Sequence, residues 1–139
     1  MVNKQYNKGY RFEQEVKHFL EKQGFLVFRS AGSHSPVDLI AFRQTYKIQG
    51  VMLKPFFIQC KATQSTYIPR KELKQYLAFS QQWQTPLYVV FPRKCCPFFT
   101  VVREQSNGKP ILEPAMWVFV GKTMKQIREE LEKEGKKYE

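Results

Sequence analysis

Acidic residues are scarce in this sequence, and aspartate is almost absent. Of the 12 acidic residues 11 are glutamate, so Asp38 is the only aspartate, against 23 lysines and arginines and a formal net charge of +11. Residues 1–120 hold 17 of the bases and 7 of the acids, a net charge of +10, which leaves residues 121–139 nearly neutral. So basic a chain predicts a polyanionic partner, either nucleic acid or an anionic membrane surface.

Long apolar runs are missing too. No stretch approaches the roughly 18 apolar residues of a transmembrane helix, and the first residues lack the apolar core of a signal peptide. The three cysteines, Cys60, Cys95 and Cys96, form neither an even set nor the paired pattern of a zinc site. We therefore expect reduced thiols in a cytoplasmic protein, or in the host cytoplasm if the gene is viral. The 139 residues, without repeats or low-complexity linkers, predict a single domain.

Hydrophobic periodicity predicts an α/β fold with a central mixed β-sheet flanked by helices. Residues 8–23 are expected to form a helix whose apolar stripe is Phe12, Val16, Phe19 and Leu20, ended by Gly24. A second helix is expected to have Pro69 in its first turn. On its apolar face we expect Leu73, Leu77 and Trp83, widened by Tyr76 and Phe79.

The strands are expected at short apolar runs bounded by turn residues. They are residues 25–28, 37–42, 56–62, 87–91, 98–102 and 116–120, with a turn at 31–36 and a hairpin over 43–55 that turns near Gln49 and Gly50. A charged helix is expected from Thr123 to about residue 135.

Four side chains on three of these elements could act together. Glu13 lies beside the apolar stripe of the first helix, and Asp38 begins a strand just after a polar turn. Gln59 and Lys61 are two positions apart, so their side chains lie on one face of the sheet. Carboxylate and amide oxygens suit Mg²⁺, and a lysine could position a water and steady the charge of an attacked phosphate. Taken singly, however, a helical glutamate and a strand lysine are usually just solvated.

The sequence resembles the archaeal-type Holliday junction resolvases of the PD-(D/E)xK nuclease superfamily over roughly residues 4–92. An Arg-Ser-Ala-Gly-Ser segment before the aspartate, with the helix glutamate in register, is the most specific part of the likeness. The segments that carry it are residues 8–13, 19–25, 29–33, 36–41, 59–63, 67–73 and 77–80.

This resemblance implies a fold, a cofactor and an activity. The fold would be restriction-endonuclease-like, with residues 1–120 as the nuclease domain and residues 121–139 as a helical extension of it. Mg²⁺, with Mn²⁺ as a substitute, would be held by Glu13, Asp38 and Gln59, and Lys61 would assist the attacking water. Ser33 would complete the catalytic set. A homodimer would nick four-way DNA junctions symmetrically, leaving 5′-phosphate and 3′-hydroxyl ends, with no membrane partner and no small-molecule cofactor.

Two departures from the family pattern stand out. Gln59 stands at the position of the usual ExK acid, so the motif reads Gln-Cys-Lys and one negative charge is lost. Metal affinity is therefore expected to fall. Asp38 and Gln59 are also 21 positions apart, long for the family, which indicates an enlarged hairpin between them.

Several basic and aromatic residues are candidates for DNA contact because they flank the predicted site. They are Lys4, Lys8, Arg11, Arg29, His34, Tyr67, Arg70 and Lys71. Two other functions stay open at this point: a related nuclease with another DNA target, and a DNA-binding protein that has lost catalysis through the change at Gln59.

Overall fold

The computed structural model describes residues 4–30, 35–47 and 50–120. The elements follow one another as α1 (Lys4–Lys22), β1 (Leu26–Arg29), β2 (Leu39–Lys47), β3 (Gly50–Cys60), α2 (Arg70–Trp83), β4 (Leu87–Phe91), β5 (Phe98–Glu104), β6 (Pro110–Pro114) and α3 (Met116–Val120). The predicted helix of residues 123–135, the extension 121–139 and most of the predicted turn at 31–36 lie outside the described residues.

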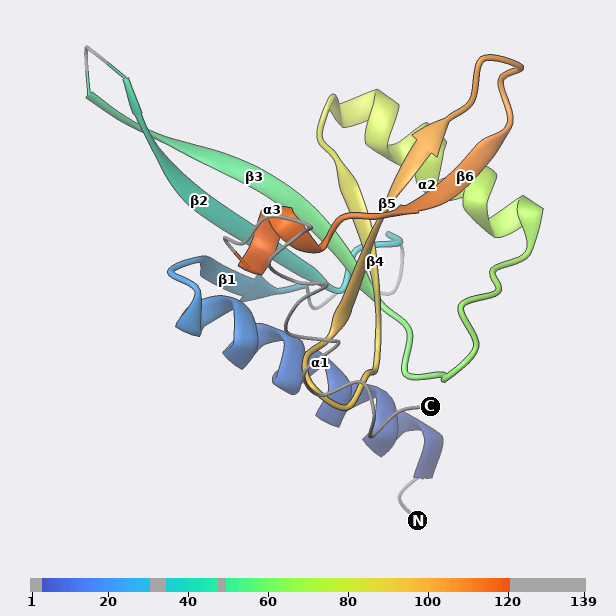
Figure 1. Ribbon diagram of the computed structural model, residues 1–139, viewed down its shortest axis with the longest axis horizontal. Helices are drawn as coiled ribbons and strands as arrows, with labels where there is room; N and C mark the ends of the chain where they lie inside the picture. The colour runs from blue at the N-terminus through green and yellow to red at the C-terminus, as the bar shows by residue number, and fades with distance from the viewer. Residues whose placement is uncertain (1–3, 31–34, 48–49, 121–139) are drawn as a thin grey trace.

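The six strands form one sheet in chain order, from β1 at one edge to β6 at the other (Figure 1). Only β3 and β4 are parallel, and the other neighbours are antiparallel, so the predicted mixed sheet is confirmed. The parallel step requires a crossover, and α2 supplies it between β3 and β4.

Each face of the sheet has its own apolar core. On one face α1 and α3 pack on alternate residues of the strands, including Ile58 and Val90. On the other face α2 packs on the residues between them, including Val89. Every residue of β4 is buried, as expected for a central strand covered on both faces.

The predicted stripe of α1 is confirmed. Val16 and Leu20 are fully buried, Phe12 is 5% exposed, and Phe19 packs partly buried against the same core. Gly24, at a φ of 93°, ends the helix in the left-handed conformation that glycine adopts without strain. This packing fixes the rotation of α1 about its axis and therefore the direction of Glu13.

The predicted strand at residues 116–120 is wrong: this segment is helix α3. A short apolar run has no period that distinguishes a buried strand from a buried helix, and the packing of Phe119 on Phe56 and Phe99 decides it. The strand beside β5 is instead β6, which the sequence analysis missed because prolines stand at both of its ends. At the sheet edge a missing backbone N–H is tolerated.

Other boundaries differ by a few residues. Pro69 is the residue before α2, rather than part of its first turn, and Trp83 is 57% exposed, so it does not lie on the buried face. Tyr76 is the buried residue of that helix. The hairpin is confirmed, and its two strands extend beyond the other strands of the sheet. β2 and β3 stay paired until Lys47 faces Gly50. No helix within the described ranges is long and apolar enough to cross a membrane.

Candidate active site

The candidate site lies at the end of the sheet where β2 begins and where β3 and β4 end. The backbone N–H of Asp38 donates to the carbonyl of Ile58 at 2.8 Å, and the N–H of Lys61 donates to the carbonyl of Val90 at 2.9 Å. These bonds extend the sheet beyond its regular strands. They bring Asp38 beside the last residues of β3.

Asp38 is held by its neighbours on both sides. Its carboxylate accepts a 2.8 Å hydrogen bond from the backbone N–H of Cys60, and its carbonyl accepts one from Ser30 at 2.8 Å. Burial raises the pKa of Asp38 to about 6; the Cys60 hydrogen bond opposes this, and the charge of Glu13 adds to it. The two carboxylates are therefore close enough to repel one another. Such a pair favours a cation between them.

Glu13 reaches the same end of the sheet from α1. Its side chain is 17% exposed and accepts a hydrogen bond from Nε of Arg29 at 2.9 Å, at the end of β1. The guanidinium of Arg29 also lies 4.9 Å from the ring centroid of Tyr10. Arg29, predicted as a phosphate contact, is thus placed against a predicted metal ligand.

Gln59 and Lys61 lie on one face, as their spacing predicts. Ile58 is fully buried in the core under α1, and Cys60 packs against that same core, so the residues between and after them face the α2 side. Gln59 is half-buried and pairs with Val89 of β4. The described residues contain no group of three His, Cys, Asp or Glu side chains placed to hold a metal ion.

Glu72 is the residue that the sequence analysis missed. Its Oε1 accepts hydrogen bonds from Nζ of Lys61 at 2.7 Å and from the hydroxyl of Tyr76 at 3.0 Å. The Lys61 hydrogen bond lowers the pKa of Glu72, whereas burial and the Glu72 carboxylate raise that of Tyr76. A sequence signal existed: Glu72 is the only acid between Asp38 and Glu104.

A groove of about 630 Å³ runs between α1 and the loop that joins β4 to β5. Neither Glu13 nor Asp38 lines this groove, and the groove carries more bases than acids. The basic residues that line it are Arg11, Lys22, Arg93 and Lys94. A groove of this charge is suited to a nucleic-acid backbone.

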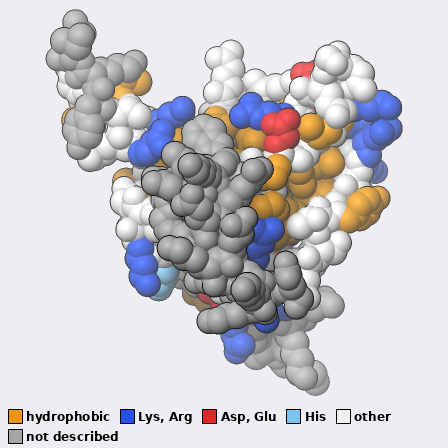
Figure 2. All heavy atoms as spheres, viewed as in Figure 1, with side chains coloured by type: hydrophobic (Ala, Val, Ile, Leu, Met, Phe, Trp, Pro, Cys, Tyr) orange, Lys and Arg blue, Asp and Glu red, His pale blue; other side chains and the backbone are white. Residues whose placement is uncertain are grey.

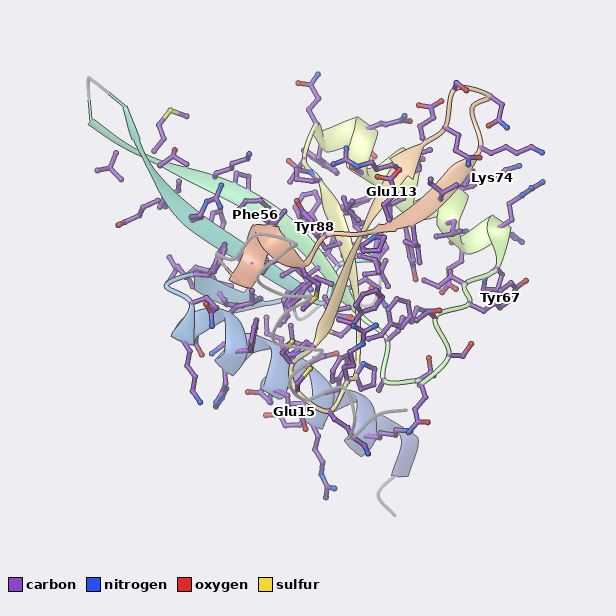
Figure 3. The ribbon with its side chains drawn as sticks, viewed as in Figure 1. Glu15, Phe56, Tyr67, Lys74, Tyr88 and Glu113 are labelled. Carbon is purple, nitrogen blue, oxygen red and sulfur yellow. The ribbon has the colours of Figure 1, made fainter. Side chains whose placement is uncertain are left out.

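The remaining residues predicted to contact DNA are distributed around this end of the sheet. Tyr67 is 78% exposed on the connection between β3 and α2 (Figure 3), and Arg70 and Lys71 are exposed at the start of α2. Lys8 is exposed on α1, and Lys4 begins that helix. Ser33 and His34 lie outside the described residues, so their predicted roles stay predictions.

The architecture and the site together define a class. The fold is restriction-endonuclease-like: a mixed sheet flanked by helices. A glutamate from a helix, an aspartate beside a strand and a Gln-x-Lys pair lie at one end of its strands. The solved structure of a Holliday junction resolvase, Hjc from Archaeoglobus fulgidus, matches it with a TM-score of 0.53 and 22% identity, over 78% of this chain and 85% of the other.

The family model described as archaeal Holliday junction resolvase (Hjc) matches residues 4–109. The chain therefore belongs to that family. A curated relative, the crossover junction endodeoxyribonuclease Hjc of Methanocaldococcus jannaschii, is 42% identical over 78 residues, which are 55% of this chain. The match spans about half, 52%, of that relative's length.

Proposed function

We propose that this chain is a metal-dependent endonuclease that resolves four-way DNA junctions by paired, symmetric nicks. The observation that carries the proposal is that Glu13, Asp38 and Lys61 lie close together at one end of the strands. The chain also belongs to the resolvase family and has a strongly basic body. The activity in the printed name of the Methanocaldococcus jannaschii relative supports the same function.

The residues at the site fit a hard divalent cation. All candidate donors are oxygens: the carboxylates of Glu13 and Asp38 and the amide oxygen of Gln59. Asp38 is part-buried, and its ionised form is disfavoured by burial and by Glu13, so a cation there would relieve both effects. A bound Mg²⁺ would draw charge from the scissile phosphate.

The chain's own residues would do the rest. Lys61 would orient the attacking water and steady the charge on the phosphate, and Glu72 would hold its ammonium group in place. Water adds to phosphorus, the bond to the 3′ oxygen breaks, and that oxygen takes the proton, which leaves a 5′-phosphate and a 3′-hydroxyl. Arg29 would contact phosphate as the metal takes over the charge of Glu13.

A homodimer would place two such sites on one junction. Phe99 and Phe119 are buried in the core and are not free to form its interface. An uncovered apolar face instead lies on the α2 side of the sheet. Its exposed members are Leu26 at 50%, Phe28 at 54%, Leu53 at 50% and Trp83 at 57%. A second copy of the chain is the partner that we propose for this uncovered apolar face.

The test compares a synthetic four-way junction with a linear duplex of the same sequence, each with and without Mg²⁺. We expect paired nicks at symmetric positions in the junction alone, and no product with a chelator. Cleavage of both substrates would mean a nuclease with another target. Binding without cleavage at every metal concentration would mean a DNA-binding protein that has lost catalysis, which the neutral Gln59 makes a specific alternative.

The dimer is tested separately by measuring the mass of the chain in solution. We expect Phe28→Glu and Trp83→Glu to yield monomers, because each places a charge in the uncovered apolar face. Lys74→Glu, an exposed change elsewhere on α2, is the control. A monomeric parent protein would contradict this part of the proposal.

A further inference from the structure

The outer halves of β2 and β3 form a two-stranded ribbon that projects from the body of the molecule (Figure 1). The pairs from Arg43–Lys54 to Lys47–Gly50 make up this ribbon, and residues 51–54 on it are exposed. The function proposed above assigns Leu53 of the ribbon to the uncovered apolar face and leaves the opposite face of the ribbon unassigned. The ribbon is continuous with the strand segments beside Asp38 and Gln59.

Two cations face one another across the ribbon. Arg43 is the register partner of Lys54, so both side chains lie on one face, which we term the cationic face. Both lie over the ring of Phe56, with the Arg43 guanidinium carbon 5.5 Å and the Lys54 Nζ 5.6 Å from the ring centroid. Figure 2 shows lysine and arginine side chains gathered where the ribbon leaves the body, and Figure 3 shows Phe56 beneath it beside Tyr88.

Among the described residues, no acid balances this pair. In the part of the chain that the structure describes, neither Arg43 nor Lys54 forms an ion pair, and residues 39–71 contain no Asp or Glu at all. At the opposite edge of the sheet the arrangement differs, because Arg103 pairs with Glu113 at 3.1 Å. The ribbon therefore carries a close pair of cations without a nearby described acid.

Like charges directly opposite on neighbouring strands destabilise a ladder. The ring of Phe56 attracts both cations but carries no net charge, so it leaves the repulsion between them in place. An anion that lies between the two groups removes that repulsion and binds both. A phosphodiester is such an anion, and DNA presents phosphates in a continuous row.

The pair lies a short way along β2 from Asp38, on the α1 side of the sheet, whereas Gln59 and Lys61 face the α2 side. Arg43 is five residues from Asp38 along β2, about 17 Å at the usual rise of an extended strand. One turn of B-DNA spans about 34 Å, so the pair lies about half a turn from the site of cleavage. That is about 5 base pairs along one arm of the junction.

We propose that the cationic face of the ribbon grips the phosphate backbone of one duplex arm, about half a helical turn from the cut. This rests on the proposed function, because it takes one arm of the DNA held at the Asp38 site to reach the α1 side of the ribbon. Val51 and Leu53 lie on the other face of the ribbon, continuous with the uncovered apolar face. The two faces of the ribbon thus serve DNA and the second copy of the chain.

The first experiment measures the salt dependence of junction binding. Arg43→Gln/Lys54→Gln removes two charges from the ribbon, and Lys74→Gln/Lys109→Gln removes two exposed charges from the opposite side of the molecule, where Figure 3 places Lys74. Each lost phosphate contact costs about tenfold in affinity near 0.1 M salt and about 0.9 in the slope of log K against log salt. The ribbon variant lacks two such contacts, so we expect it to show each of these losses twice, once for each contact. We expect neither loss in the control.

The second experiment neutralises the DNA rather than the protein. Methylphosphonates replace the phosphates about half a turn from the branch in one arm, and both proteins are titrated with both junctions. We expect the neutral arm to weaken the parent protein and to have little further effect on the ribbon variant, since each change removes the same contact. The charge-retaining swap Arg43→Lys/Lys54→Arg is expected to bind like the parent, which controls for loss of fold.

The outcomes separate the two proposals. If the parent cleaves junctions, and the ribbon variant keeps the parent's salt slope or the two losses simply add, the ribbon proposal is wrong and the proposed function stands. If the parent binds linear duplex but shows no preference for junctions, the proposed function fails. The salt slopes of the two variants on that duplex then decide the ribbon proposal by themselves.

Discussion

The Nζ atom of Lys61 lies 2.7 Å from Oε1 of Glu72, and the hydroxyl of Tyr76 donates to that same oxygen at 3.0 Å. The ammonium group, which follows the third strand, is thereby anchored to the first turn of α2. A lysine on a flexible stem has several rotamers to lose, and this contact selects one before substrate arrives. Glu72 is on these grounds a positioning residue for Lys61.

Glu72→Gln keeps a side chain of the same length but removes its charge. We expect the single-turnover rate of junction cleavage to fall about tenfold, because Lys61 loses its fixed position, while the dissociation constant stays within about twofold. Tyr76→Phe keeps the ring 5.9 Å from Lys61 Nζ and removes only the hydroxyl that donates to Glu72, so we expect a smaller loss of rate from it than from Glu72→Gln. In a Lys61→Gln background the Glu72 change should cost nothing more; additive losses would mean that Glu72 acts by another route.

Asp38→Asn tests the assignment of the metal ligands. The amide oxygen can still accept the hydrogen bond from Cys60, so the local fold is retained, but the ligand charge is gone. We expect cleavage to be abolished and junction affinity to persist, since loss of a negative charge does not weaken attraction to phosphate. Gel-based cleavage and binding assays on one junction measure both. Cleavage that survives at the parent's rate would remove Asp38 from the site.

The same substitution has an expected effect on stability that needs no metal. The pKa of Asp38 is about 6 in the folded protein against 3.8 for the free side chain, so the folded state binds the proton more tightly. Ionisation above pH 6 therefore costs stability, and this cost disappears as the pH falls towards 4. Because the group is partly solvated, we expect Asp38→Asn to stabilise the fold by about 1 kcal/mol at pH 8.

Thermal unfolding with a chelator present measures this difference at pH 8 and at pH 4. The advantage of the variant should be seen at pH 8 and should be absent at pH 4. An equal shift at both pH values would show that packing, rather than the buried charge, accounts for the effect.

Gln59→Glu places an acid at the position where the resemblance described in the sequence analysis leads us to expect one. An added carboxylate beside Glu13 and Asp38 should bind a divalent cation more tightly, so we expect the Mg²⁺ concentration for half-maximal rate to fall several-fold. The control is Gln75→Glu, an exposed change of equal charge on α2. An unchanged Mg²⁺ requirement would mean that Gln59 does not contact the metal.

Much of the candidate site could be derived from local rules. The two-residue period of a strand places Gln59 and Lys61 on one face, and the apolar stripe of α1 directs Glu13 to the edge of that stripe. The hairpin was also predictable, because a turn-forming Gln-Gly separates two runs of strand-forming residues. These features depend on neighbours within a few positions along the chain.

The errors fell where contacts distant in sequence decide the outcome. Residues 116–120 form a helix because Phe119 stacks on Phe99 at 4.4 Å and meets Phe56, not because of any local signal. The edge strand β6 exists because β5 offers it a partner. Local propensity is weak enough that such packing overrides it.

By itself, then, the sequence determined the charge of the body, the single aspartate and the faces on which the site residues lie. Only the tertiary structure decided which charges meet. Glu72 reaches Lys61 and Arg29 reaches Glu13 across 11 and 16 positions, whereas Arg43 and Lys54 face one another with no acid from the described part of the chain between them. The reason is physical: periodicity fixes the direction of a side chain within its own element, and packing between elements fixes its neighbours.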